Sequence, residues 1–139
     1  MIAGFWQTDY ELKSPIRASG CALLSAMYIA PVSFSQGDVN EMYDALLGVG
    51  FIDKDCMILD WKSVLNSVSA SMHFKFKCLE GYPCAAGERE IIKWWLSNVK
   101  ENHFTVGDGK SRTQWDSMNR PDIMAKYATF VEKVIVTVG

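Results

Sequence analysis

The spacing of apolar residues changes near residue 73, and this change constrains the fold more than any other feature of the chain. Before that point apolar residues follow a helical period. In "WKSVLNSVSA" they stand at i, i+3, i+4 and i+7, as Trp61, Val64, Leu65 and Val68. After it, "HFKFKCL" alternates apolar and polar residues, as a half-buried strand does. Helices followed by strands are typical of an α+β domain with an antiparallel sheet.

Four helices are expected, over residues 21–30, 38–50, 61–70 and 87–99. The first is apolar on nearly every side, which predicts burial, and Pro31 ends it. Asp38 and Glu41 have the spacing of a capping box at the start of the second, and Asp60 caps the third. The mixed charges of "GEREIIK" indicate a solvated face on the fourth. Residues 1–19 are expected to be irregular.

Strands are expected over residues 73–79, 103–107, 112–115 and 129–138. The prediction is therefore a layer of N-terminal helices packed on an antiparallel sheet of about four to six strands. No repeat, low-complexity stretch or linker-like segment divides the chain. Since 139 residues are enough to bury a core, residues 1–139 are predicted to form a single domain.

Charge and hydropathy exclude several classes of function. The net charge is −2 and no basic run occurs, so nothing favours binding to nucleic acid or to an anionic membrane. No apolar run approaches the roughly 18–20 residues of a membrane span. The first residues lack the features of a signal peptide. The protein is expected to be cytoplasmic as synthesised, with release by lysis or by a dedicated secretion route as an open alternative.

The four cysteines are expected to be free thiols, because disulfide frameworks belong to secreted proteins. Cys78 and Cys84 do not have the spacing of a structural zinc site, and neither Cys56 nor His73 completes one. No metal and no other cofactor is therefore expected.

Cys21 begins the first expected helix, directly after Gly20 in "SGCALLSAM". A helix N-terminus carries about half a unit of positive charge, which favours a thiolate over a thiol. A thiolate is a nucleophile near neutral pH, so Cys21 is the candidate nucleophile. The alternative is that Cys21 is a small apolar core residue.

A nucleophilic thiol needs a base, and His103 is the better placed of the two histidines. It opens the expected strand "HFTVG", whereas His73 opens an earlier strand and can be exposed or structural. Asp116 follows after a turn and a strand that return the chain beside His103, so its carboxylate can orient the imidazole. Asp108 is the competing carboxylate, but its place beside Gly109 favours a role in the turn.

Acyl transfer also needs hydrogen-bond donors for the developing oxyanion. The backbone N–H of Cys21 is one, and the side-chain amide of Gln7 in "WQTDY" is the candidate for the second; a surface glutamine is the alternative. Trp94, Trp95 and Trp115 are candidates to line a substrate groove. On the expected helix Trp94 and Trp95 point about 100° apart, so one of the two belongs in the core.

In order and spacing, "WQTDY", "SGCALLSAM" and "HFTVGDGKSRTQWDSM" resemble the bacterial papain-like cysteine peptidases of the C39-like group. The resemblance spans most of the chain and implies a papain-like fold. It also implies four roles: the oxyanion hole for Gln7, the nucleophile for Cys21, the base for His103 and the orienting carboxylate for Asp116.

Two positions depart from the pattern of that group. Ala22 stands where the group usually has glycine, and Ser117 stands where it usually has proline. Ala22 adds a β-carbon where the backbone passes close to the substrate, which affects efficiency or specificity. Neither change removes a catalytic atom.

These residues and the resemblance predict a thiol hydrolase that cleaves a peptide or amide bond. By analogy of fold, the substrate is a peptide or a peptidoglycan cross-link, cut by a phage enzyme or a secreted effector. Two alternatives stay open. One is a C39-like binding module that has lost activity. The other is an acyltransferase or transglutaminase, in which an amine replaces water in the last step.

Overall fold

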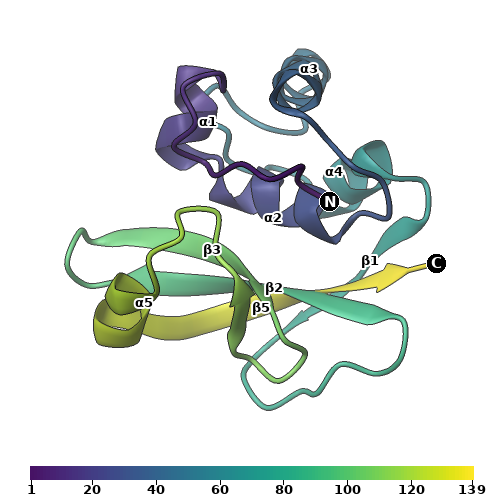
Figure 1. The fold of residues 1–139 in the computed structure, drawn as a ribbon. Coiled ribbons are helices and arrows are strands. Elements are labelled where there is room, and N and C mark those ends of the chain that lie inside the picture. The colour runs from purple at the N-terminus through teal and green to yellow at the C-terminus, as the bar shows by residue number, and fades with distance from the viewer.

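A five-stranded antiparallel sheet forms one layer of the molecule, and α1 to α4 lie together over one side of it (Figure 1). The computed structural model describes residues 1–139. In chain order the elements are α1 (Ser14–Ser19), α2 (Cys21–Ile29), α3 (Gln36–Gly48), α4 (Trp61–Val68), β1 (Met72–Cys78), β2 (Glu88–Leu96), β3 (Glu101–Gly107), β4 (Thr113–Trp115), α5 (Pro121–Tyr127) and β5 (Ala128–Val138). The α+β class with helices packed on an antiparallel sheet, predicted from the sequence, is confirmed.

The strands lie in the order β1-β5-β2-β3-β4, and each neighbouring pair is antiparallel. The last strand, β5, therefore lies inside the sheet, between β1 and β2. At the other edge the short β4 pairs with β3 only at Val106 and Gly107. The first part of β3, which contains His103 and Phe104, is left with an open edge.

Helix α2 packs directly on this sheet, and all but one of its side chains are buried. Leu23 and Met27 of α2 belong to the same core as Ile91 of β2, Val106 of β3 and Val134 of β5. Burying one such side chain stabilises the fold by about 1.5–3 kcal/mol. This core fixes the first turn of α2 against β3.

A tight junction between α1 and α2 places Cys21 at the start of its helix. A side chain at Gly20 would put a β-carbon 2.5 Å from the carbonyl oxygen of Ile16, so only glycine fits there. Residues 1–19 were predicted to be irregular, and this was wrong for Ser14–Ser19. Pro15 lies in the first turn of α1, where proline favours a helix because its missing N–H is not needed.

Residues 87–99 do not form the predicted helix and instead contain β2. The prediction failed because both faces of this central strand are covered, so its apolar residues do not alternate. Ile91 lies in the core under the helices. Glu90, on the other face, is fully buried against Lys133 of β5. Since its partner is 43 residues away, the sequence gives no local sign that Glu90 is buried.

The remaining helices differ from prediction mainly at their ends. Asp60 caps α4 as predicted, accepting a hydrogen bond from the Ser63 N–H. The capping box of α3 joins Ser35 and Asp38, three residues earlier than predicted, so α3 is longer at its start. The short helix α5 was not predicted. None of the helices is long and apolar enough to cross a membrane.

Candidate active site

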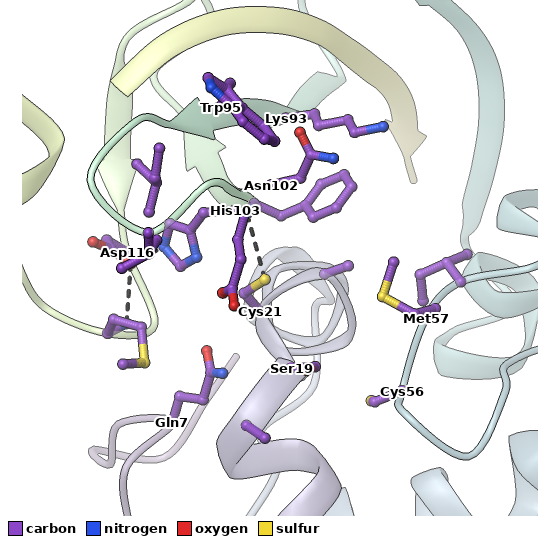
Figure 2. A pocket seen from close by; sticks show the side chains of 18 of the residues that line it. Gln7, Ser19, Cys21, Cys56, Met57, Lys93, Trp95, Asn102, His103 and Asp116 are labelled. Atoms are coloured by element: carbon purple, nitrogen blue, oxygen red, sulfur yellow. Dashed lines mark hydrogen bonds and ion pairs between the residues drawn. The ribbon is translucent and has the colours of Figure 1, made fainter. Parts of the chain in front are cut away.

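Cys21 lies in the first turn of α2, against the open edge of β3 (Figure 2). The backbone N–H of Phe104, in the part of β3 that β4 leaves unpaired, donates to Sγ of Cys21 at 3.4 Å. The first N–H groups of α2 have no acceptor within the helix, so their partial positive charge lies beside the same sulfur. Cys21 is therefore next to donors from two elements that are far apart in the sequence.

His103 and Asp116 form a buried pair beside Cys21. Nε2 of His103 lies 2.6 Å from Oδ1 of Asp116, and both side chains are about one-tenth exposed. This contact leaves the other ring nitrogen, Nδ1, free of Asp116, and Cys21 is close enough to the ring to raise its pKa. The predicted nucleophile, base and orienting carboxylate are thus brought together in one line.

The charge state of His103 follows from its partners. Burial acts to lower the pKa of His103, but the hydrogen bonds to Asp116 and Cys21, with the charges of both, raise it to about 10. Burial acts to raise the pKa of Asp116, but His103 and the N–H groups of Met118 and Arg120 hold it below its usual value. At neutral pH the site therefore contains an imidazolium beside the sulfur.

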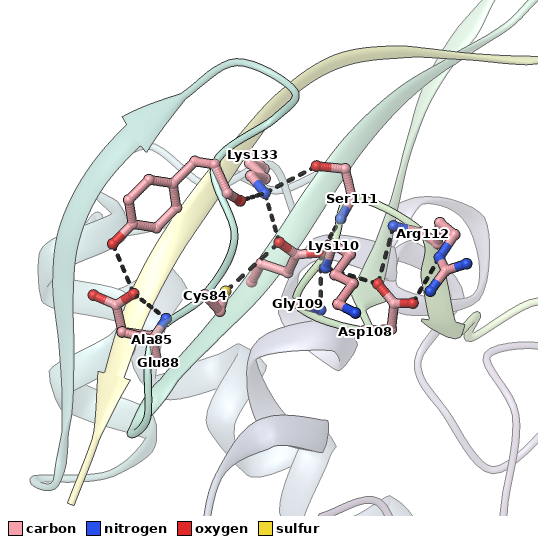
Figure 3. Close-up of polar contacts among 11 residues, drawn as sticks. Cys84, Ala85, Glu88, Asp108, Gly109, Lys110, Ser111, Arg112 and Lys133 are labelled. Atoms are coloured by element: carbon pink, nitrogen blue, oxygen red, sulfur yellow. Dashed lines mark hydrogen bonds and ion pairs between the residues drawn. The ribbon is translucent and has the colours of Figure 1, made fainter.

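Asp108, the competing carboxylate, is not in the site. Its side chain accepts from the N–H of Lys110 and from Arg112 within the β3–β4 turn (Figure 3). The other histidine, His73, lies on β1 with an exposed side chain and does not border the site. The structure thus brings together Asp116 and His103, the pair chosen from the sequence.

Gln7 is buried next to the start of α2, with its amide nitrogen toward the helix (Figure 2). Its Nε2 donates to the carbonyl oxygen of Arg17 at 3.2 Å. The backbone N–H of Cys21 is among the first N–H groups of α2, which have no acceptor within their own helix. One N–H of Gln7 and the N–H of Cys21 are therefore available to a ligand oxygen.

A cavity of about 610 Å³ opens over Cys21, and Gln7, His103 and Asp116 line it as well. Apolar side chains make up much of its wall. They come from the loop before α4 and its first residue, from β2, and from the segment that contains α5: Met57, Leu59, Trp61, Trp95, Met118, Ile123 and Met124. Such a cavity accommodates a small or extended organic ligand.

Only one of the three predicted groove tryptophans borders this cavity. Trp94 and Trp95 are on a strand and so point to opposite faces; Trp95 lines the cavity, whereas Nε1–H of Trp94 donates to Thr105 at 2.8 Å. Trp115 stacks on Tyr28 instead, with ring centroids 4.3 Å apart. Trp94 and Trp115 therefore do not border the cavity that contains Cys21.

Sequence reasoning missed the walls that Met57, Leu59, Ile123 and Met124 form. Met57 and Leu59 are about half exposed or more, although both are large and apolar. The apolar run "MILDW" before a helix cap was the available signal, since a loop that keeps such residues in water often serves binding. Ile123 and Met124 lie on the short helix α5. Because the sequence pattern did not predict this helix, it gave no reason to place its side chains at the site.

The other three cysteines differ from Cys21 in their surroundings. Burial raises the pKa of Cys56 to about 12 and that of Cys84, which also lies beside Glu90, to about 11. Burial also raises the pKa of Cys78. All four cysteines are free thiols. No group of three or more histidine, cysteine and acidic side chains is arranged to hold a metal ion.

The chain matches the family described as "Protein of unknown function, DUF261" over residues 3–135, and it belongs to that family. Searches of curated proteins and of solved structures find no match. The matched range includes Gln7, Cys21, His103 and Asp116, so the whole candidate site lies in the part of the chain that the family shares.

Proposed function

We propose that this member of the DUF261 family is a thiol hydrolase that cleaves a peptide or other amide bond. The observation that carries the proposal is the line from Asp116 through His103 to Cys21, at a helix start and in the wall of one cavity. A thiol, an imidazole and an orienting carboxylate in this order are the parts of a cysteine nucleophile and its base.

In the first half of the proposed reaction, Sγ of Cys21, whose proton His103 holds, attacks the carbonyl carbon of the bound substrate. A carbon–sulfur bond forms, and the electron pair of the carbonyl double bond moves to oxygen. The N–H of Cys21 and the free N–H of Gln7 donate to this oxyanion. When the carbonyl re-forms, the carbon–nitrogen bond breaks. His103 gives its proton to the leaving amine, and a thioester on Cys21 remains.

In the second half, water attacks the thioester while neutral His103 accepts its proton. The second oxyanion uses the same two donors. Collapse breaks the carbon–sulfur bond, the carboxylic acid leaves, and the thiolate–imidazolium pair is restored. Asp116 stays ionised throughout, holds the ring by Nε2 and stabilises its positive charge.

The walls of the cavity support an organic substrate with apolar groups near the scissile bond. Met57 and Leu59 border one part of it, and Ile123 and Met124 border another. A peptide fits this description, and a peptidoglycan-type cross-link is the finer proposal, carried over from the resemblance to C39-like peptidases. All four residues of that pattern are present, which favours an enzyme over an inactive module.

Reactivity of the four thiols tests the proposal. Peptide mass mapping after brief exposure to iodoacetamide from pH 5 to pH 9 measures each cysteine separately. Cys21 is expected to react at lower pH than the other three, whose raised pKa values keep them as thiols. His103→Ala is expected to remove this advantage. Equal rates for all four cysteines, or no effect of His103→Ala, would refute the activated nucleophile.

Acylation by p-nitrophenyl acetate tests the next step. One acetyl group is expected on Cys21, followed by its release to water. Release only when an amine such as glycinamide is added would indicate the acyltransferase alternative. Digestion of peptidoglycan and of unfolded protein, followed by mass analysis, then distinguishes the two substrate classes. An activated Cys21 that forms no acyl-enzyme would favour the inactive binding module.

A further inference from the structure

Ser117 connects the candidate oxyanion donor to the segment that carries the orienting carboxylate. Its hydroxyl donates to Oε1 of Gln7 at 2.6 Å, and its carbonyl oxygen accepts from the backbone N–H of Gln7 at 2.8 Å. Ser117 is fully buried and directly follows Asp116. Segments 110 residues apart in the sequence are thus joined by two hydrogen bonds beside the site.

These contacts fix which end of the Gln7 amide faces which partner. The carbonyl oxygen of Arg17 can only accept, so it requires the Nε2 end of the amide. The hydroxyl of Ser117 meets the Oε1 end. A flipped amide would set its oxygen against the carbonyl of Arg17. In the observed orientation the second N–H of Nε2 remains for the cavity, whereas a flip would turn an acceptor toward the oxyanion.

A stack of aromatic rings holds the same two segments from outside. Trp6, next to Gln7, lies parallel to Trp115, next to Asp116, with ring centroids 6.1 Å apart. Trp115 in turn stacks on Tyr28 of α2. The backbone at Gln7 is therefore held by packing even without the serine hydroxyl, so the hydroxyl is left with a local task, the orientation of the amide.

We propose that Ser117 is a positioning residue that orients the Gln7 amide toward the oxyanion, so one short segment serves both the base and the oxyanion hole. This inference rests on the proposed function. It assigns a role to a position where the chain departs from the C39-like pattern, since the proline usual there has no hydroxyl to donate.

Two reactions of the same thiol separate this role from a merely structural one. Acylation of Cys21 by p-nitrophenyl acetate passes through an oxyanion, whereas alkylation by iodoacetamide occurs at a saturated carbon and forms none. Ser117→Ala is expected to slow acylation by about 10- to 100-fold, part of the roughly 10²–10³-fold effect of losing an oxyanion donor. It is expected to leave the alkylation rate and its pH profile unchanged. Ser117→Cys, of similar size with a weaker donor, is expected to be intermediate.

A double-mutant cycle with Gln7→Ala completes the test. In the Gln7→Ala background, Ser117→Ala is expected to cause no further loss of acylation. Equal losses with and without Gln7, or a parallel fall in alkylation, would overturn the inference, because Ser117 would then act on the fold. If Gln7→Ala slows acylation and Ser117→Ala does not, only the inference fails. If wild-type Cys21 is not acylated at all, the proposed function fails and the inference with it.

Discussion

Two buried ion pairs hold the β3–β4 hairpin, one at its turn and one at its open end. They differ in whether every polar atom of the pair has a hydrogen-bond partner. At the turn, Glu90 and Lys133 are both completely buried, and Nζ of Lys133 lies 2.7 Å from a carboxylate oxygen of Glu90. At the open end, His103 and Asp116 are 2.6 Å apart and face a cavity. The first pair is closed to ligands, whereas the second has a ring nitrogen directed at a nucleophile.

The turn pair has a partner for every charged group. Nζ of Lys133 donates to Glu90, to Ser111 and to the carbonyl of Tyr82, which uses all three of its protons. The second carboxylate oxygen of Glu90 accepts from the N–H groups of Gly109 and Ser111. These contacts bind the turn to β2 and β5, so we expect this pair to support the fold and to perform no chemistry.

Close packing around Glu90 extends this structural role to Gly107, the last residue of β3. A β-carbon at Gly107 would lie 2.1 Å from a carboxylate oxygen of Glu90. Glycine is therefore needed where β3 enters the turn. A buried charge whose hydrogen-bond partners are complete holds its segments in place, whereas one that faces a cavity with an atom to spare is available for reaction.

Cys21→Ala gives the largest expected effect on activity. It also distinguishes the open pair from the turn pair most clearly, because activity should be lost without a loss of stability. Acylation and turnover should disappear, because no sulfur remains to form the thioester. The free energy of unfolding should change by about 1 kcal/mol or less, since one small buried side chain replaces another. Urea unfolding and the p-nitrophenyl acetate assay on the same sample measure both. Residual acylation would mean that another residue is the nucleophile.

Asp116→Asn, with Asp108→Asn as its matched control, tests which carboxylate serves the base. Asp116→Asn should lower the acylation rate by roughly 10²-fold, less than the roughly 10⁴-fold loss in a serine enzyme, because Cys21 also contributes to the raised pKa of His103. Asp108→Asn should have little effect, since Asp108 binds only its own turn. The reverse pattern would identify Asp108 as the partner of His103. If both variants retain activity, the site is a Cys–His dyad.

Lys133→Met should have the opposite profile to Cys21→Ala. It leaves Glu90 as a buried charge without its counterion, which costs about 3–5 kcal/mol of stability. The folded fraction at low temperature should still acylate Cys21 at a rate close to that of the wild type, because Lys133 is not part of the cavity wall. Circular dichroism during urea unfolding measures the first effect. A loss of activity without a loss of stability would mean that the turn pair acts on the site.

The sequence was sufficient for the parts of the fold that depend on local spacing. The helix that starts at Cys21 and the strand that starts near His103 were both predicted within a few residues. The error at β2 has a different origin, because burial of Glu90 depends on Lys133, and no local pattern records a contact between distant strands. Residues 14–19 were expected to be irregular, although Pro15 lies in the first turn of α1, where proline favours a helix.

The candidate site was more predictable than its surroundings. Cys21, His103 and Asp116 lie together as expected, because a thiol needs a base and a base needs an orienting group, whatever the fold around them. No comparable chemical requirement fixes where the tryptophans lie. Trp94 was expected on a helix, whereas the segment that contains it is the strand β2. The hydrogen bond between Ser117 and Gln7 joins residues that are 110 positions apart in the sequence, so only the structure reveals it.

The titration of His103 is the last and smallest effect, and it tests whether the open pair is coupled to the sulfur. Since its pKa is raised from about 6.5 to about 10, protonated His103 favours the folded state. That contribution is complete below about pH 6.5 and is lost as the pH rises through about 10.

In a His73→Gln background, which leaves one histidine, ring NMR signals should report an imidazolium well above pH 7. Cys21→Ala should lower this pKa, because it removes the interactions with Cys21 that raise it, while Asp116 still acts on Nε2. Each unit of the fall corresponds to about 1.4 kcal/mol of coupling between ring and sulfur. Lys133→Met should not move the signals, since the turn pair has no contact with the ring. An unchanged pKa in Cys21→Ala would mean that His103 and Cys21 are neighbours without being a catalytic pair.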